Sequence, residues 1–222
     1  MNRPSLLLLV TLACSGATSV GFSTRNIAAW GDSLTEGQPY TRAEAYPARL
    51  GELFPDRIVV NEGVGGETSS QILARMRTDT THRHDVTVLW MGRNNYADRG
   101  RVELDIAAAV KSLGTDRFVI LAILNGDFDG YEAKGAPGYQ TITGINTRLA
   151  LRYRDHFLDI RSYLVSLYDP SDPTDVKNHG YDIPPASLRA QWSGGADAVH
   201  LSPEGNSRVA ARVAQFITQK GW

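Results

Sequence analysis

The chain has 222 residues, a length that fits one large domain. Hydrophobic residues make up 42% of the sequence and charged residues 21%, close to the averages of globular proteins, which excludes a disordered or fibrous chain. The 23 Lys and Arg residues are balanced by 24 Asp and Glu residues, for a formal net charge of -1. Because a polyanion-binding protein needs a basic excess or a basic patch, we expect no nucleic-acid partner.

Residues 1–17 are predicted to be a signal peptide. A short basic start precedes an apolar run over residues 6–13, and the small residues Ser15 and Ala17 stand where a cleavage site is expected. The run is shorter than the ~18 apolar residues that cross a bilayer, so no transmembrane segment is predicted. The stretch that ends at Cys14 is similar to a bacterial lipoprotein signal, which leaves a lipid anchor as the alternative. Both routes predict an exported protein, periplasmic or secreted.

The predicted mature domain covers residues 24–222. Cys14 is the only cysteine in the chain, so this domain has no disulfide, no thiolate metal ligand and no catalytic cysteine. About 200 residues are enough to fold on a hydrophobic core alone.

Short apolar runs alternate with longer helical patterns along this domain. Strands are predicted at residues 26–30, 57–60, 86–91, 118–124 and 157–160. Helices are predicted at residues 43–54, 68–77, 101–113, 140–154 and 203–219, the last with Ser202 as its cap and Pro203 at its first position. The alternation predicts a parallel sheet with helices on both faces. No repeat or linker interrupts it, which indicates a single α/β domain.

Unusual residues gather in the loops that follow these strands. Open parallel sheets place their chemistry beyond the carboxyl ends of the strands. Residues 31–37 read G-D-S-L-T-E-G, residues 61–68 read N-E-G-V-G-G-E-T and residues 92–95 read G-R-N-N. A fourth segment, D-A-V-H at residues 197–200, stands just before the last predicted helix.

Together these four segments resemble, in order and spacing, the sequence blocks of the SGNH hydrolase superfamily, also called GDSL-type esterases and lipases. The resemblance extends from the first strand to the last helix. It implies a flavodoxin-like three-layer sandwich of about five parallel strands in the order 2-1-3-4-5. It also implies serine-dependent hydrolysis of carboxylic esters, and we expect no cofactor.

The resemblance assigns three catalytic roles. A serine hydroxyl is a weak nucleophile until a base takes its proton and a third group orients that base. Ser33 matches the nucleophile, His200 the general base and Asp197 the residue that orients the base. The same chain order occurs in α/β-hydrolases, but their G-x-S-x-G motif is absent around Ser33.

An oxyanion hole needs donors aimed at the charge of the tetrahedral intermediate. The resemblance implies the backbone amide of Ser33, the amide of Gly66 and the side chain of Asn94, with Gly65 as an alternative to Gly66. The commonest family form of the third block is G-x-N-D, whereas this chain has Asn95 at the last position. The departure puts the packing around that residue in doubt.

Two further residues, Arg93 and Asp32, are candidate substrate contacts. For Arg93, a salt bridge or a solvated surface charge is the alternative. The long loops at residues 125–138 and 168–197 are expected to frame the pocket, because long loops often build binding sites. Their mixture of acidic and aromatic residues favours a polar substrate, such as an acetylated carbohydrate, over a long acyl chain.

Other function classes stay open. A lysophospholipase, a thioesterase or an acyltransferase could use the same residues, and a non-catalytic flavodoxin-like binding module is disfavoured because all the catalytic positions are intact. The glycine loop at residues 63–66 lacks the patterns of a dinucleotide or phosphate loop.

No metal site is predicted. The His-Arg-His-Asp run at residues 82–85 precedes the third strand and is interpreted as solvated surface. Asp169, Asp172 and Asp175 are spaced like calcium ligands, but two prolines between them indicate an ordinary loop.

Overall fold

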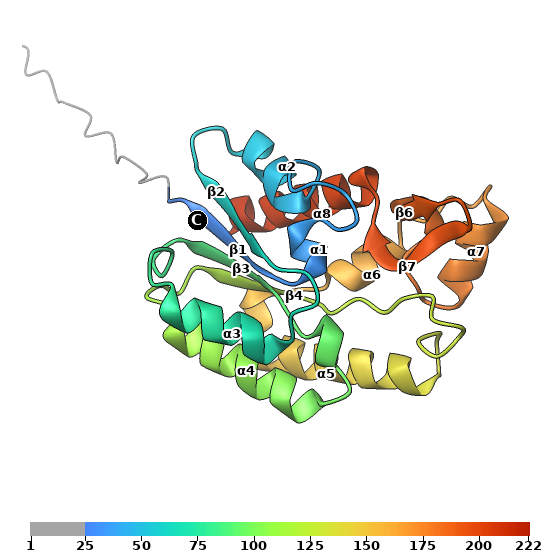
Figure 1. Ribbon diagram of the computed structural model, residues 1–222, viewed down its shortest axis with the longest axis horizontal. Helices are drawn as coiled ribbons and strands as arrows, with labels where there is room; N and C mark the ends of the chain where they lie inside the picture. Colours follow the sequence, from blue (N-terminus) through green and yellow to red (C-terminus); the bar gives the residue numbers. More distant parts are fainter. Residues whose placement is uncertain (1–24) are drawn as a thin grey trace, which may run out of the picture.

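The computed structural model describes residues 25–222, so the predicted signal peptide and Cys14 lie outside the described residues. A five-stranded parallel sheet has the order β2-β1-β3-β4-β5, which confirms the predicted topology (Figure 1). The strands are β1 (Ile27–Gly31), β2 (Val59–Gly63), β3 (Val86–Trp90), β4 (Phe118–Leu121) and β5 (Phe157–Leu158).

Helices cover both faces of this sheet and make it the middle of three layers (Figure 1). Alternate residues of β1 face opposite layers, with Ile27 and Ala29 in one core cluster and Ala28 and Trp30 in the other. The first cluster is covered by α2 (Tyr46–Leu53), α6 (Ile160–Val165) and α8 (Pro203–Gln219). The second is covered by α3 (Ser69–Thr78), α4 (Arg99–Ser112) and α5 (Pro137–Tyr153).

The last helix has the predicted bounds. The Ser202 hydroxyl accepts a hydrogen bond from the Gly205 amide at 3.1 Å, and Pro203 occupies the first turn. Both features fix where the helix begins. The serine hydroxyl satisfies a backbone amide of the first turn, and proline has no backbone amide hydrogen that would be left without a partner there.

All five strands differ in their bounds from the predicted ranges, by one residue at β1 and β3 and by more at β2, β4 and β5. β2 covers Val59–Gly63, where residues 57–60 were expected, and it reaches into the glycine-containing block at residues 61–68. β5 is only two residues long, because Asp159 caps α6 by accepting a hydrogen bond from the Ser162 amide. That cap starts a helix where the sequence pattern predicted the strand to continue.

The segment at residues 168–197 was expected to be a long loop and is mostly regular structure. It contains α7 (Pro173–Gly180) and β6 (Arg189–Trp192), and its end enters β7 (Gly195–Leu201). β6 and β7 form a separate two-stranded antiparallel sheet beyond one end of the main sheet (Figure 1). The short elements that complete the fold are α1 (Ser33–Glu36), η1 (Arg93–Asn95), η2 (Arg154–His156) and η3 (Ala186–Leu188).

The acidic residues in this segment have structural partners. Asp172 caps α7 by accepting from the Thr174 amide at 2.7 Å. Asp175 is buried and accepts hydrogen bonds from the amide and the hydroxyl of Ser187. Within residues 25–222, no helix has the length and hydropathy needed to span a membrane.

Candidate active site

The turn between β1 and α1 places the Ser33 hydroxyl. The carboxylate of Asp32 caps α1 by accepting from the Leu34 amide at 3.1 Å. A side chain at Gly31 would meet Thr35 Oγ1 at 2.1 Å and the Trp90 carbonyl at 2.5 Å, so only glycine fits where the chain leaves the sheet. The tight turn holds Ser33 at the carboxyl end of β1.

His200 lies between Ser33 and Asp197. Its Nε2 atom is 2.9 Å from Ser33 Oγ, and its Nδ1 atom is 3.2 Å from Asp197 Oδ1. Both His200 and Asp197 belong to β7, whereas Ser33 follows β1. The fold therefore brings together three side chains in the arrangement that activates a serine nucleophile.

Hydrogen bonds keep Asp197 ionised. Burial acts to raise the pKa of this carboxyl group, but hydrogen bonds from the backbone amides of Val199 and His200 outweigh burial and lower it. The indole Nε1 of Trp192 donates to the other carboxylate oxygen at 3.3 Å. An anionic Asp197 can accept a hydrogen bond from the Nδ1–H group of His200, which leaves the Nε2 lone pair free to act as a base.

A cavity of about 430 Å³ opens over the serine and the histidine. It is lined by Ser33, Gln38, Gly66, Arg93, Asn94, Tyr96, Phe128, Val199 and His200. The sequence blocks that are distant along the chain thus meet around one cavity.

The two glycines of the second block differ in their contacts. Gly66 lines the cavity and has a φ of +78°, and a Cβ atom added to it would meet no other atom within 4 Å. The Gly65 amide instead donates to the Glu36 carboxylate at 2.9 Å. Because the Gly65 amide is already committed, Gly66 is the better placed of the two for a ligand in the cavity.

Asn94 and Asn95 have separate contacts. Asn94 lines the cavity, and one of its Nδ2 hydrogens is donated to the Glu67 carbonyl at 2.9 Å. Asn95 accepts from the Ser69 amide and donates to the Ser69 hydroxyl, which ties η1 to the start of α3. The side-chain amide of Asn95, which stands where the commonest family form has an acid, therefore has hydrogen-bond partners of its own in Ser69.

Comparison with known proteins identifies the family. Residues 29–208 match the GDSL-like lipase/acylhydrolase family. The chain belongs to this family. It is therefore a GDSL-family hydrolase, an enzyme that cleaves carboxylic esters.

Solved structures share its fold at low sequence identity. A lipase/acylhydrolase from Enterococcus faecalis is 15% identical, with a TM-score of 0.66 over 88% of this chain and 96% of that one. A psychrotrophic esterase, EstA, from Pseudoalteromonas sp., solved with monoethylphosphonate as inhibitor, is 14% identical, with a TM-score of 0.58 over 88% and 98% of the two chains.

A curated relative is much longer. The tail spike protein of Salmonella phage epsilon15 is 30% identical in an alignment of 159 residues that covers 66% of this chain. The hydrolase matches only 14% of the length of that phage protein.

In this GDSL-family hydrolase, Arg93 lines the cavity and also forms a salt bridge. Its guanidinium is 2.7 Å from the Glu132 carboxylate and donates to the Leu124 carbonyl at 3.1 Å. It also lies 5.0 Å from the ring centroids of both Tyr96 and Phe128. The arginine therefore joins the cavity wall to the loop at residues 125–138.

Asp32 does not line the cavity of the hydrolase. The residue is 1% exposed, and its carboxylate turns back toward the amide that it caps. Burial raises the pKa of Asp32 to about 7, against the opposing effects of the Leu34 amide and the Arg93 charge. The structure thus corrects the expectation of a substrate contact, because helix capping holds this side chain in the interior.

Sequence reasoning did not single out Gln38, Tyr96 or Glu132. Gln38 follows the first block by one residue, and Tyr96 follows the third block directly, so closeness to a block was the available signal. Glu132 accepts a hydrogen bond from the Tyr96 hydroxyl at 2.7 Å as well as pairing with Arg93. Nothing in the sequence pairs Glu132 with residues so distant along the chain.

Proposed function

We propose that Ser33, His200 and Asp197 are the catalytic triad of this ester hydrolase. The observation that carries the proposal is the position of His200, with Nε2 2.9 Å from Ser33 Oγ and Nδ1 3.2 Å from Asp197 Oδ1. These distances allow the serine proton to pass to Nε2 while the carboxylate holds the other ring nitrogen.

The reaction follows in two halves. Ser33 Oγ attacks the acyl carbon of the ester as Nε2 of His200 takes the hydroxyl proton. When the tetrahedral intermediate collapses, the C–O bond to the alcohol breaks, and His200 returns the proton to the leaving oxygen. Water then attacks the acyl-enzyme with the same base, releasing the carboxylic acid and free Ser33.

An oxyanion hole is proposed from the Ser33 amide, the Gly66 amide and the Asn94 side chain. Three observations support it. Gly66 and Asn94 line the same cavity as Ser33. The amide of Gly65, the alternative to Gly66, already donates to the Glu36 carboxylate, and Asn94 uses only one of its Nδ2 hydrogens for the Glu67 carbonyl. The second Nδ2 hydrogen can stabilise negative charge on the former carbonyl oxygen.

The proposed substrate is a short-acyl ester, above all an acetyl group, on a carbohydrate or another polar molecule. The cavity wall mixes the polar side chains of Gln38, Arg93 and Asn94 with the rings of Tyr96 and Phe128. A long acyl chain is better served by a continuous apolar lining. The signal peptide proposed for residues 1–17 would bring such an enzyme to extracellular glycans.

The test combines a substrate panel with one variant. Wild-type enzyme is assayed on p-nitrophenyl esters of increasing acyl length and on acetylated glycans, with labelling by a fluorophosphonate probe. Ser33→Ala should lose about 10⁴–10⁶-fold in rate and all of the labelling, because nothing replaces the nucleophile. The exposed Ser166→Ala, whose hydroxyl donates only to the Tyr163 carbonyl, is the matched control.

Three results would contradict parts of the proposal. Labelling of Ser33→Ala at the wild-type level would reject the triad. A rate that rises steadily toward long acyl chains would reject the substrate class and favour the lysophospholipase or thioesterase alternative. Accumulation of acylated glycan in place of free acid would favour an acyltransferase.

A further inference from the structure

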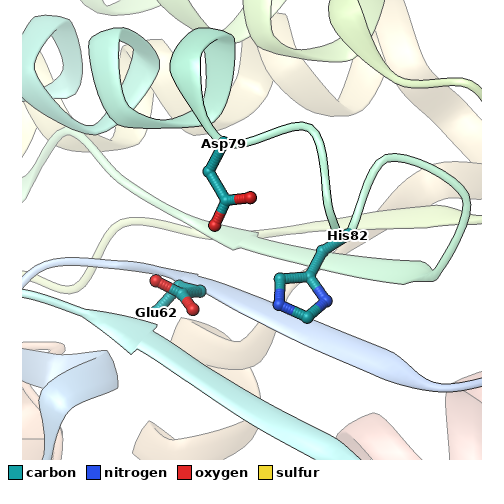
Figure 2. A group of neighbouring side chains, drawn as sticks. All are labelled: Glu62, Asp79 and His82. Carbon is teal, nitrogen blue, oxygen red and sulfur yellow. The ribbon is translucent and has the colours of Figure 1, made fainter.

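Three side chains with metal-binding chemistry meet outside the catalytic cavity. Glu62 lies in the edge strand β2, Asp79 directly follows α3, and His82 lies in the segment that leads into β3. One ligand atom from each residue lies within 4.8 Å of the other two. Figure 2 shows the three side chains converging on the space between β2 and the end of α3.

The ring of His82 is held in the orientation that a metal ligand needs. Its Nδ1 is 2.8 Å from the carboxylate of Asp85, and both side chains are largely buried, at 19% and 18% exposed. This contact corrects the interpretation of both residues as solvated surface. With the proton on Nδ1 facing Asp85, Nε2 carries a free lone pair, and Figure 2 shows a ring nitrogen turned toward Glu62. Histidines that bind metals commonly donate their other N–H to a carboxylate in this way.

Both carboxylates keep an oxygen available. Asp79 accepts from the Thr81 amide through Oδ1 at 2.9 Å, which leaves Oδ2. Glu62 Oε2 is 3.6 Å from Arg75 Nη1, a distance too long for a hydrogen bond, and Oε1 is also left. Shifts of about 1 Å would bring such atoms to the 2.0–2.2 Å bond lengths of a zinc ion.

The electrostatic surroundings favour a cation. Arg75, which faces Glu62, is already neutralised, because its Nε and Nη2 atoms donate to the Glu67 carboxylate at 2.7–3.0 Å. Arg83 lines the same small pocket as Asp79 and His82 and is the other positive group beside them. The charges of Glu62, Asp79 and Asp85 remain, and Asp79 stands at the C-terminal end of the ten-residue helix α3. The carbonyl end of a helix adds negative potential there.

We propose that Glu62, Asp79 and His82 bind one divalent ion of the zinc type, with water completing the coordination. An imidazole with two carboxylates suits zinc, whereas calcium and magnesium prefer oxygen ligands alone. The ion joins the edge strand β2, the end of α3 and the segment before β3. Its role is structural, because none of the three residues lines the catalytic cavity.

The experiment measures zinc binding directly. Untagged protein is treated with a chelator, desalted and titrated with zinc chloride by calorimetry, and thermal unfolding is followed with zinc, calcium or magnesium. The variants are His82→Gln, Asp79→Asn and Glu62→Gln, with circular dichroism to confirm folding. His84→Gln is the matched control, because His84 is exposed and its Nδ1 faces the Gly114 carbonyl.

We expect wild type to bind one zinc ion that the three variants bind more than about 10-fold more weakly, and His84→Gln to match wild type. Asp85→Asn should weaken binding by about 10–100-fold, since it removes the partner of Nδ1. Zinc should raise the unfolding temperature of wild type, and calcium and magnesium should not. Wild-type zinc affinity in both His82→Gln and Asp79→Asn, or an equal loss in His84→Gln, would overturn the proposal.

Discussion

The buried carboxyl group of Asp32 makes stability depend on pH in an unusual direction. Burial raises its pKa from 3.8 to about 7, and the carboxylate oxygen Oδ2 has no hydrogen-bond partner within the described residues. A shift of about three units corresponds to about 4 kcal/mol at 1.36 kcal/mol per unit. That energy is the cost of ionising this side chain inside the folded protein.

The sign follows from proton binding. Between pH about 4 and pH about 7, the folded state holds a proton on Asp32 that the unfolded state has lost, so the unfolding free energy falls as the pH rises. Asp32→Asn removes this titration and keeps an oxygen that can accept from the Leu34 amide. The variant should therefore gain stability over wild type as the pH rises through this window, by up to about 4 kcal/mol.

Urea unfolding at a series of pH values measures this difference. The exposed Asp56→Asn variant controls for the loss of one negative charge. Comparing each variant with wild type at the same pH cancels the contributions of the other titrating groups. A difference between Asp32→Asn and wild type that stays constant from about pH 5 to about pH 7 would refute the reasoning.

Three further predictions concern the cavity and its supports. Asn94→Ala should lower kcat by about 10²–10³-fold with little change in KM, the usual loss for one oxyanion donor, and a raised KM with unchanged kcat would make Asn94 a substrate contact. Trp192→Phe removes one donor to Asp197 but leaves its backbone hydrogen bonds, so kcat should fall by less than about 10-fold; a loss as large as that of a triad variant would contradict this. Glu132→Gln leaves the charge of Arg93 without its partner in a site where their side chains are 2% and 10% exposed, so urea unfolding should show a loss of about 3–5 kcal/mol, and a loss below about 1 kcal/mol would contradict it.

The bounds of an element were predicted best where residues within or beside that element determine them. The bounds of α8 follow from a serine cap, a proline and a long amphipathic pattern, all of which act within a few residues. The prediction of a loop at residues 168–197 was wrong, because α7 is capped by Asp172 and the β6–β7 pairing depends on contacts that local sequence does not reveal.

The site residues also separate into those that local sequence predicts and those that depend on contacts in the folded chain. The blocks carrying Ser33, Asn94 and His200 could be found in the sequence. The parallel topology explains why the first two meet, whereas His200 reaches them from β7 in the separate antiparallel sheet. The expected substrate contact at Asp32 was wrong, because a carboxylate at a helix start turns toward the helix amides. The pairing of Arg93 with Glu132 joins segments 39 residues apart and requires the folded loop.

The small β6–β7 sheet is not hydrogen-bonded to the strands that form the centre of the protein, yet it carries His200 and Asp197, while Ser33 begins α1 directly after β1 of the main sheet. Cooperative units of a protein can open at free energies below that of global unfolding. A partial opening of this hairpin would separate base from nucleophile and withdraw Val199 and Leu201 from the first hydrophobic cluster, while the second cluster, which contains no residue of the hairpin, stays packed. Catalytic activity therefore depends on the β6–β7 hairpin being folded in place. Mild denaturant should abolish activity reversibly at concentrations below those that unfold the parallel sheet.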